Sequence, residues 1–282
     1  MRATVMATPA HSPATIAALQ TNRAVARLVL SARQAGERSV LQDLREGGGY
    51  RIKFPDPERG LEAVLVNTGG GLLGGDAVSL DVVAGDNTDL MVTTQSAEKV
   101  YRAVAAPSEI AVTLTASHGA KLHWLPQETI LFSGARLIRR ISADMTPGAE
   151  LVIAEATTFG RLEMGEQLGP GALRDHWRIR RNGRLTFAED MKLEGDLSAL
   201  LDRPAVGGGA RASGVLLILA DDAESRLEKA RHLMDHADVS AGASAWDGKL
   251  VVRLLASSPA ALRAVMITLI TGLTGRTTPR FW

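Results

Sequence analysis

Residues 67–92 read NTGGGLLGGDAVSLDVVAGDNTDLMV, and this stretch decides the fold. A glycine-rich run is followed by an alternating apolar and polar segment, a turn at Gly85, and a second apolar segment at residues 90–92. Alternation with a period of two is typical of a strand with one buried face. The stretch therefore predicts two strands joined by a glycine turn.

The glycine run contains G-x-G-x-x-G at Gly69, Gly71 and Gly74, which is the spacing of a dinucleotide-binding loop. Such a loop requires a helix that begins at the third glycine, because the helix N-terminus receives the pyrophosphate. The segment after Gly74 predicts a strand instead. We therefore expect the glycines to supply positive φ angles and close backbone approach, and Asp76 to lie in a crowded position between strands.

The order of strand, glycine turn and strand recurs three times, in residues 110–124, 137–153 and 177–187. The second strand of each unit begins with a leucine, and these leucines lie 32, 29 and 34 residues apart: Leu90, Leu122, Leu151 and Leu185. This period is compatible with stacked β coils or successive hairpins, although any all-β protein shows turn signals at such intervals. We predict a mainly β fold with a β-solenoid-like or layered β architecture.

Helical patterns occur only near the C-terminus. Residues 222–234 combine an acidic first turn with an apolar stripe, and Ser258-Pro259 begins a second apolar pattern that Gly272 ends. A short strand is predicted between them at residues 248–255. The sequence thus predicts two C-terminal α-helices.

The chain is predicted to form a single mainly β domain over residues 23–282, whose helical part spans about 222–275. Residues 1–22 are rich in Ala, Thr and Pro and predict a mobile tail, with a transit peptide as the alternative. Residues 204–214 contain three consecutive glycines and predict a mobile loop.

The composition excludes several classes of function. With 32 basic and 31 acidic residues the net charge is +1, so no overall field attracts nucleic acid. The absence of cysteine excludes disulfides, thiolate metal sites and a cysteine nucleophile. No apolar run approaches the ~20 residues that span a bilayer, so we expect a cytoplasmic protein without membrane contact. The P-loop motif G-x-x-x-x-G-K-[ST] is also missing, so the chain is not itself a GTPase of that type.

Several segments resemble the urease accessory protein UreD/UreH family. They are NTGGGLLGGD at 67–76, TTQSAEKVYR at 93–102, LPQE at 125–128, FGR at 159–161 and PRFW at 279–282. They occur in the family's order, and the resemblance runs from about Arg27 to the end of the chain. Two features depart from the family: Thr68-Gly69 stands where many relatives carry Pro-Pro, and residues 1–22 have no counterpart.

The resemblance implies a mainly β protein with a helical C-terminal portion that is not itself an enzyme. It further implies assembly with the accessory proteins UreF and UreG on apo-urease and assistance in delivering nickel to the urease active site. UreG is the GTPase of that set, which agrees with the missing P-loop here. No tightly bound cofactor is expected, only nickel in transit.

Carboxylates are the candidate nickel contacts, because a conduit must hold Ni²⁺ weakly enough to release it. Polar residues follow each anchor leucine, and equal register predicts that Gln95, Glu128 and Glu155 line one polar track. The candidate path residues are Asp76, Glu128, Glu155 and Glu163, with Gln95, Lys99 and Arg161 as supporting groups. For each carboxylate the alternative is an exposed charge or a surface salt bridge.

Other interpretations remain open from the sequence. His232 and His236 have the i, i+4 spacing of a metal-chelating pair, although a solvated helix face is the favoured interpretation. A purely structural module that binds UreF and urease without touching metal is an alternative function. A β-solenoid carbohydrate-active enzyme is another, disfavoured because aromatic residues make up only 4% of the chain and such grooves usually offer aromatic platforms.

Overall fold

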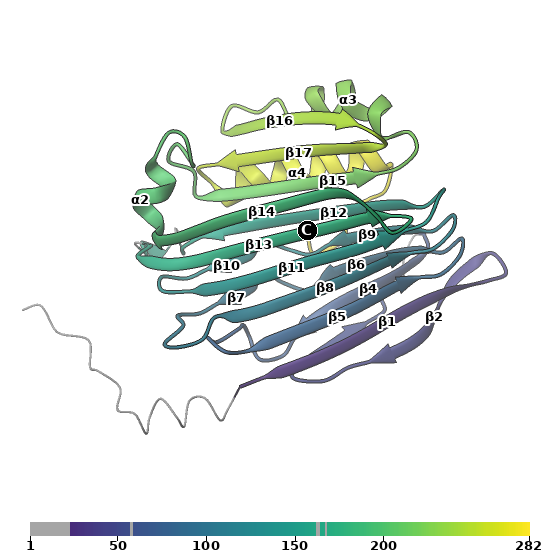
Figure 1. The fold of residues 1–282 in the computed structure, drawn as a ribbon, viewed down its shortest axis with the longest axis horizontal. Coiled ribbons are helices and arrows are strands. Elements are labelled where there is room, and N and C mark those ends of the chain that lie inside the picture. The colour runs from purple at the N-terminus through teal and green to yellow at the C-terminus, as the bar shows by residue number, and fades with distance from the viewer. Residues whose placement is uncertain (1–22, 57–58, 162–163, 167) are drawn as a thin grey trace, which may run out of the picture.

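A computed structural model of the chain describes residues 23–56, 59–161, 164–166 and 168–282. Two β-sheets lie face to face, and helices cover the far side of one of them (Figure 1). The predicted mainly β, β-solenoid-like architecture is confirmed. The predicted tail at residues 1–22 and the candidate Glu163 lie outside the described residues.

Sheet A has seven strands. In spatial order they are β14 (Arg184–Asp196), β13 (Pro170–Arg181), β11 (Arg136–Met145), β8 (Ser108–Ala116), β5 (Ala77–Ala84), β1 (Val25–Ala35) and β2 (Arg38–Arg45). The five strands from β13 to β1 run parallel to one another, and the two edge strands are antiparallel to their neighbours.

Sheet B has ten strands. Eight follow the order β16 (Val239–Trp246), β17 (Lys249–Ala256), β15 (Ala212–Leu219), β12 (Glu150–Phe159), β9 (Lys121–Leu125), β6 (Asp89–Thr94), β4 (Leu61–Asn67) and β3 (Tyr50–Lys53). Of the two remaining short strands, β10 (Thr129–Leu131) pairs with β12, and β7 (Glu98–Val100) pairs with β10.

The chain coils between the two sheets, because β5, β8 and β11 of sheet A are each followed by a strand of sheet B. Leu90 pairs with Leu122, and Leu122 with Leu151, so these three anchor leucines form one column as predicted. They point into the apolar core between the sheets. Parallel register thus keeps equivalent residues of successive coils on the same face.

The fourth anchor, Leu185, was predicted wrongly. It lies on β14 in sheet A and is 49% exposed. Asn182 and Gly183 both have positive φ angles, 54° and 72°, as a tight two-residue hairpin requires. This Asn-Gly turn reverses the chain within sheet A, whereas the turns at the earlier glycines carry it across to sheet B.

The two predicted C-terminal helices are confirmed. The 3-10 helix η2 (Ala223–Arg226) leads into α3 (Leu227–Leu233), and α4 (Pro259–Thr274) begins directly after Ser258. Leu262, Met266 and Leu269 of α4 are buried in a second apolar core on the outer face of sheet B. Among the described helices, none combines the length and apolarity that a membrane crossing requires.

Two boundaries differ from the sequence-based prediction, and two elements were not predicted. Helix α4 continues through Gly272 and ends at Gly275, whose φ of 64° terminates it. A side chain at Gly272 would lie 2.4 Å from Leu233 of α3, so this glycine permits the close packing of the two helices and does not end α4. The predicted loop at 204–214 ends earlier, since β15 begins at Ala212, and Gly214 lies in that strand beneath Met266. Strand β16 and the short helix α2 (Leu197–Asp202) were not predicted.

Candidate interior site

The glycine-rich loop bends a β chain, as predicted. A side chain at Gly71, which has a φ of 147°, would lie 2.6 Å from the backbone oxygen of Lys99. Strand β5 follows from Ala77, so no helix receives a pyrophosphate. Asp76 is 5% exposed, and its carboxylate accepts hydrogen bonds from the backbone N–H groups of Ala24 (2.9 Å) and Leu73 (2.8 Å). Asp76 therefore fastens this loop to the residue that precedes β1.

A cluster of three buried charges lies between the sheets. Arg139 of β11 forms ion pairs with Glu155 of β12 and with Asp175 of β13, and all three side chains are at most 6% exposed. The Arg139 guanidinium binds both oxygens of Asp175, with Nε–Oδ1 at 3.1 Å and Nη2–Oδ2 at 2.5 Å. It binds Glu155 through a single Nη1–Oε2 contact. Asp175 is thus held at two points and Glu155 at one.

Two tryptophans orient the carboxylates of this cluster. Trp124 Nε1 donates to Glu155 Oε1 at 2.7 Å, and Trp177 Nε1 donates to Asp175 Oδ1 at 2.9 Å. Both indole rings are almost fully buried. Each carboxylate therefore keeps a neutral donor on one oxygen in addition to the arginine.

The pKa values reflect both burial and charge. Burial alone lowers the pKa of Arg139, but the negative charges of Asp175 and Glu155 outweigh it, so this pKa lies above its ordinary value. Desolvation raises the pKa of Glu155, although the charge of Arg139 opposes the shift. One guanidinium faces two carboxylates, so the cluster is anionic whenever both carboxylates are ionised.

Cavities lie on both sides of this cluster. An open groove of about 630 Å³ between β14 and strands β15 to β17 is lined by Arg139, Glu155 and Asp175. A smaller cavity of about 60 Å³ on the other side is again lined by Arg139 and Glu155, together with Trp124. The Arg139–Glu155 pair is therefore the shared wall of the two spaces.

A second polar cluster lies at the far end of the smaller cavity. The Tyr50 hydroxyl donates to Glu98 Oε2 at 2.8 Å, and Asn67 Nδ2 donates to Glu98 Oε1 at 2.9 Å. Desolvation raises the pKa of Glu98 against the effect of these hydrogen bonds. Tyr50 and Glu98 also line a third cavity of about 50 Å³, whose wall includes the exposed Lys99 and Gly70. Each of the three spaces thus shares lining residues with the next: Arg139 and Glu155 line the first two, and Tyr50 and Glu98 line the second and third.

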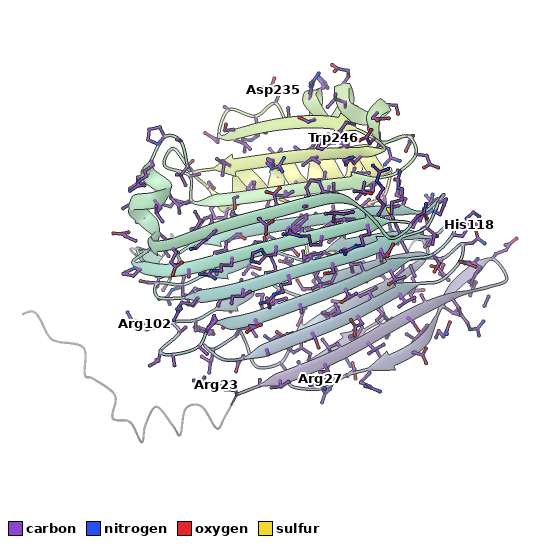
Figure 2. All side chains as sticks on the ribbon, viewed as in Figure 1. Arg23, Arg27, Arg102, His118, Asp235 and Trp246 are labelled. Carbon is purple, nitrogen blue, oxygen red and sulfur yellow. The ribbon has the colours of Figure 1, made fainter. Side chains whose placement is uncertain are left out.

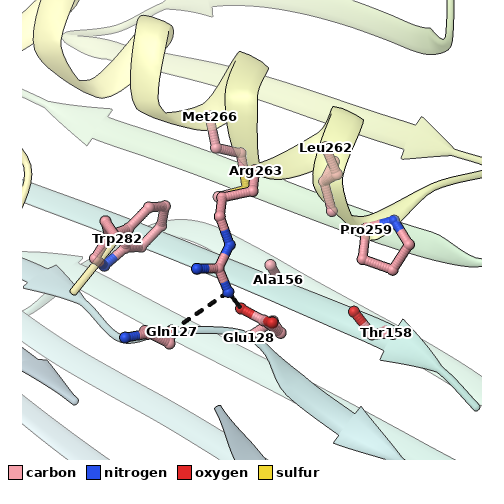
Figure 3. Close-up of a pocket in the computed structure, with 9 residues that line it drawn as sticks. All are labelled: Gln127, Glu128, Ala156, Thr158, Pro259, Leu262, Arg263, Met266 and Trp282. Carbon is pink, nitrogen blue, oxygen red and sulfur yellow. Dashed lines mark hydrogen bonds and ion pairs between the residues drawn. The ribbon is translucent and has the colours of Figure 1, made fainter. Parts of the chain in front are cut away.

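Glu128 lies apart from Glu155, so the predicted single polar track is wrong. Glu155 points into the space between the sheets, whereas Glu128 forms an ion pair of 2.5 Å with Arg263 of α4 on the outer face (Figure 3). The chain leaves strand geometry at Pro126, and equal register no longer fixes side-chain direction beyond that point. Gln95 is exposed, and its backbone oxygen accepts a hydrogen bond from Gln127.

The C-terminal residues complete this outer contact. Gln127 Nε2 donates to the backbone oxygen of Phe281 at 2.7 Å, and Trp282 Nε1 donates to that of Leu125 at 2.9 Å. Both Glu128 and Trp282 line a small space beneath α4 (Figure 3). The LPQE and PRFW segments, far apart in the sequence, are therefore hydrogen-bonded to each other.

The remaining sequence candidates lie at the surface. Arg161 pairs with Glu166 at 3.2 Å and covers the ring of Phe132. His236 lies beyond the end of α3, so it does not share a helix face with His232. Asp235 lies at the surface (Figure 2). Within the described ranges, no three His, Cys, Asp or Glu side chains are grouped closely enough to hold a metal ion.

Sequence reasoning missed Arg139, Asp175, Tyr50 and Glu98. A signal for the first two was present, because Arg139 stands between Leu137 and Ile141 at an inward position of an alternating strand. A charge at such a position is costly to bury unless it has partners. Asp175 on the adjacent strand supplies that partner, but pairing it with Arg139 requires the register of β11 against β13.

These features define a class of protein: a two-layer, β-solenoid-like fold with helices on one outer face and a charged, cavity-bearing interior. The model of the UreD urease accessory protein family matches residues 23–282, and the chain belongs to this family. Its role is therefore in urease maturation.

Three relatives illustrate the similarity. A urease accessory protein UreD of Xanthobacter autotrophicus is 47% identical over 260 residues, covering 92% of this chain and 90% of the relative. One from Rhodopseudomonas palustris (strain BisA53) is 43% identical and covers 93% and 91%. The urease accessory protein UreD 1 of Methylobacterium radiotolerans is 44% identical and covers 97% of both chains.

Proposed function

We propose that this chain is a non-enzymatic maturation factor that assembles with UreF and UreG on apo-urease and passes nickel toward the urease active site. The family membership supports a role in maturation, and the relatives are named accessory proteins. Ni²⁺ is the cargo in this proposal and not a resident cofactor.

The observation that carries the conduit role is the position of Glu155. Its carboxylate is buried between the sheets and forms part of the wall between two cavities. Glu98 occupies the corresponding position between the second and third cavities. Carboxylates spaced along such a series bind a hydrated divalent cation without enclosing it, which suits transient passage.

Filling the cavity of about 60 Å³, which shares lining residues with each of the other two spaces and is called the middle cavity below, tests the conduit. Val78 lines this cavity on the inner face of β5, whereas Val83 lies on the outer face of the same strand. The chain, its accessory partners and urease are produced together, and nickel per urease active site is measured in purified urease. We expect Val78→Phe to lower the nickel content at least about fivefold, because the added ring volume obstructs the cavity.

The matched control is Val83→Phe, which should leave the nickel content of urease unchanged. The complex with UreF must be recovered in equal amount for both variants, since the larger side chain also strains the core. Normal nickel content with Val78→Phe would contradict the conduit and leave the assembly role.

One observation favours the alternative of a purely structural module. Asp76 and Glu128 are each engaged in contacts that fasten parts of the fold, and neither lines the interior cavities described above. Under that alternative, Glu155→Gln activates urease fully as long as the complex assembles. The carbohydrate-active alternative gains no support at the interior site, because its two tryptophans, Trp124 and Trp177, are buried and present no platform.

A further inference from the structure

Arg139 occupies the place that a cation would take between two buried carboxylates. Its guanidinium contacts Glu155 on one side and Asp175 on the other, and Nη1 lies 3.4 Å from the hydroxyl oxygen of Thr129. The side chain borders both the open groove and the middle cavity. No cation can pass from one space to the other along Glu155 while the guanidinium stays there.

We infer that Arg139 is the gate of the interior passage: it remains anchored on Asp175, moves off Glu155, and so frees the Glu155 carboxylate for a divalent cation. This inference rests on the proposed function, since it assigns the control of that same passage.

The asymmetry of the contacts identifies which bond opens. The Arg139–Asp175 pair is bidentate, and such paired hydrogen bonds are stronger and more directional than a single contact. The Arg139–Glu155 pair has one contact. Releasing Glu155 therefore costs less than releasing Asp175, and the anchored guanidinium keeps a buried partner throughout.

The surroundings of Arg139 include open space beside its side chain and a Glu155 carboxylate that a second residue orients. The groove of about 630 Å³ is lined by Arg139, so open space adjoins this side chain on one side. Trp124 Nε1 donates to Glu155 Oε1 at 2.7 Å, whereas Arg139 contacts Oε2, so the indole hydrogen bond does not depend on the guanidinium and orients the carboxylate independently of it. A cation then replaces the positive charge that Arg139 removed.

Binding of Ni²⁺ alone to the full-length purified chain tests the gate by equilibrium dialysis. In Arg139→Met the competing guanidinium is absent, and we expect the Ni²⁺ dissociation constant to fall at least about tenfold. The double variant Arg139→Met/Glu155→Gln should lose that gain, because the carboxylate is neutralised. Arg140→Met is the matched control: Arg140 is the next residue of β11, is exposed, and pairs with Glu109 at 2.8 Å. It should bind Ni²⁺ as the parent chain does.

Circular dichroism establishes that each variant is folded. If Arg139→Met does not fold, Arg139→Lys retains the charge but loses the bidentate fork, and it should still gain Ni²⁺ affinity by about threefold. Unchanged affinity in the folded variant overturns the gate. A gain that persists in the double variant also overturns it, since the ion would then bind elsewhere.

The gate and the conduit can fail separately. Ni²⁺ binding by the purified chain does not depend on urease, whereas the Val78→Phe experiment reads nickel in urease. Reduced nickel with Val78→Phe, together with unchanged Ni²⁺ binding in Arg139→Met, would retain the conduit and reject the gate. Tighter Ni²⁺ binding in Arg139→Met with normal nickel in Val78→Phe would reject the conduit and, with it, the gating role.

Discussion

The two faces of sheet B each carry a glutamate paired with an arginine, in very different surroundings. On the inner face, the Glu155 and Arg139 side chains are both 4% exposed and border cavities. On the outer face, Glu128 is 19% and Arg263 36% exposed, beside the apolar packing of α4. The same chemical pair is thus a buried charge network in one place and a peripheral contact in the other.

This difference determines how strongly each ion pair should affect the free energy of unfolding. Removing one partner of a buried pair leaves an uncompensated charge in a region of low dielectric constant, whereas water solvates the partner left at a partly exposed pair. The outer face depends instead on apolar burial, which is insensitive to charge. The predictions below separate these two sources of stability.

The largest effect is expected at the inner face. Glu155→Ala leaves Arg139 with one carboxylate and removes the acceptor of the Trp124 indole N–H. We expect the free energy of unfolding to fall by about 3–5 kcal/mol, measured by urea denaturation. A loss below about 1 kcal/mol would mean that water from the groove solvates the cluster, and the contrast between the two faces would disappear.

The next effect concerns the apolar layer of the outer face. Leu269 of α4 is fully buried against sheet B, so Leu269→Ala should lower the free energy of unfolding by about 2–4 kcal/mol. This loss should be the same at pH 5 and pH 8, because no charge is removed. A pH-dependent loss would indicate that α4 also controls the nearby charged groups.

A smaller, pH-dependent effect is expected at Glu150, which also lies on the outer face. Desolvation raises its pKa, but hydrogen bonds from His123 and Arg226 outweigh this and lower the pKa to about 2. Since the folded pKa is below the unfolded value, Glu150 stabilises the fold above pH 4.5, and this contribution is lost as the pH falls from about 4.5 to about 2.

The Glu150 contribution should be about 2 kcal/mol once screening at this partly exposed site is considered. Urea denaturation at several pH values checks it. Glu150→Gln should be less stable than the parent at pH 7 and should show a flatter loss of stability between pH 4.5 and pH 2. Parallel pH profiles for the two chains would contradict the assignment.

The smallest effect is expected at Glu128. Glu128→Ala removes a single contact to the half-exposed Arg263, so the free energy of unfolding should change by less than about 1 kcal/mol. Thermal unfolding of Glu128→Ala and Glu155→Ala under identical conditions gives the direct comparison. Equal losses would show that burial does not distinguish the two pairs.

Much of the fold could be predicted because it is encoded locally. The alternation of apolar and polar residues, together with the glycine turns, predicted the stacked β coils. The column of Leu90, Leu122 and Leu151 followed from the spacing of these leucines. The Asn182-Gly183 hairpin was also readable in the sequence, and overlooking it misplaced Leu185. Strand β16 was harder to recognise, because its small residues, alanine, serine and glycine, have weak strand preference.

The candidate site was predictable only in part. Glu155 was identified as a candidate polar residue that follows an anchor leucine. Its partners, Arg139 and Asp175, lie 16 and 20 residues away on two strands of the opposite sheet. Glu128 was grouped with it because both follow an anchor leucine. The chain leaves the strand at Pro126, and the two carboxylates end on opposite faces.

The amino-acid sequence by itself determined the strand and helix periods, the bend of the glycine loop and the family, because each depends on residues close together in the chain. Only the tertiary structure decided which charges meet between the sheets and which meet beneath α4. Strand register and the packing of two sheets set those contacts, and both arise from burial summed over many residues rather than from any local pattern.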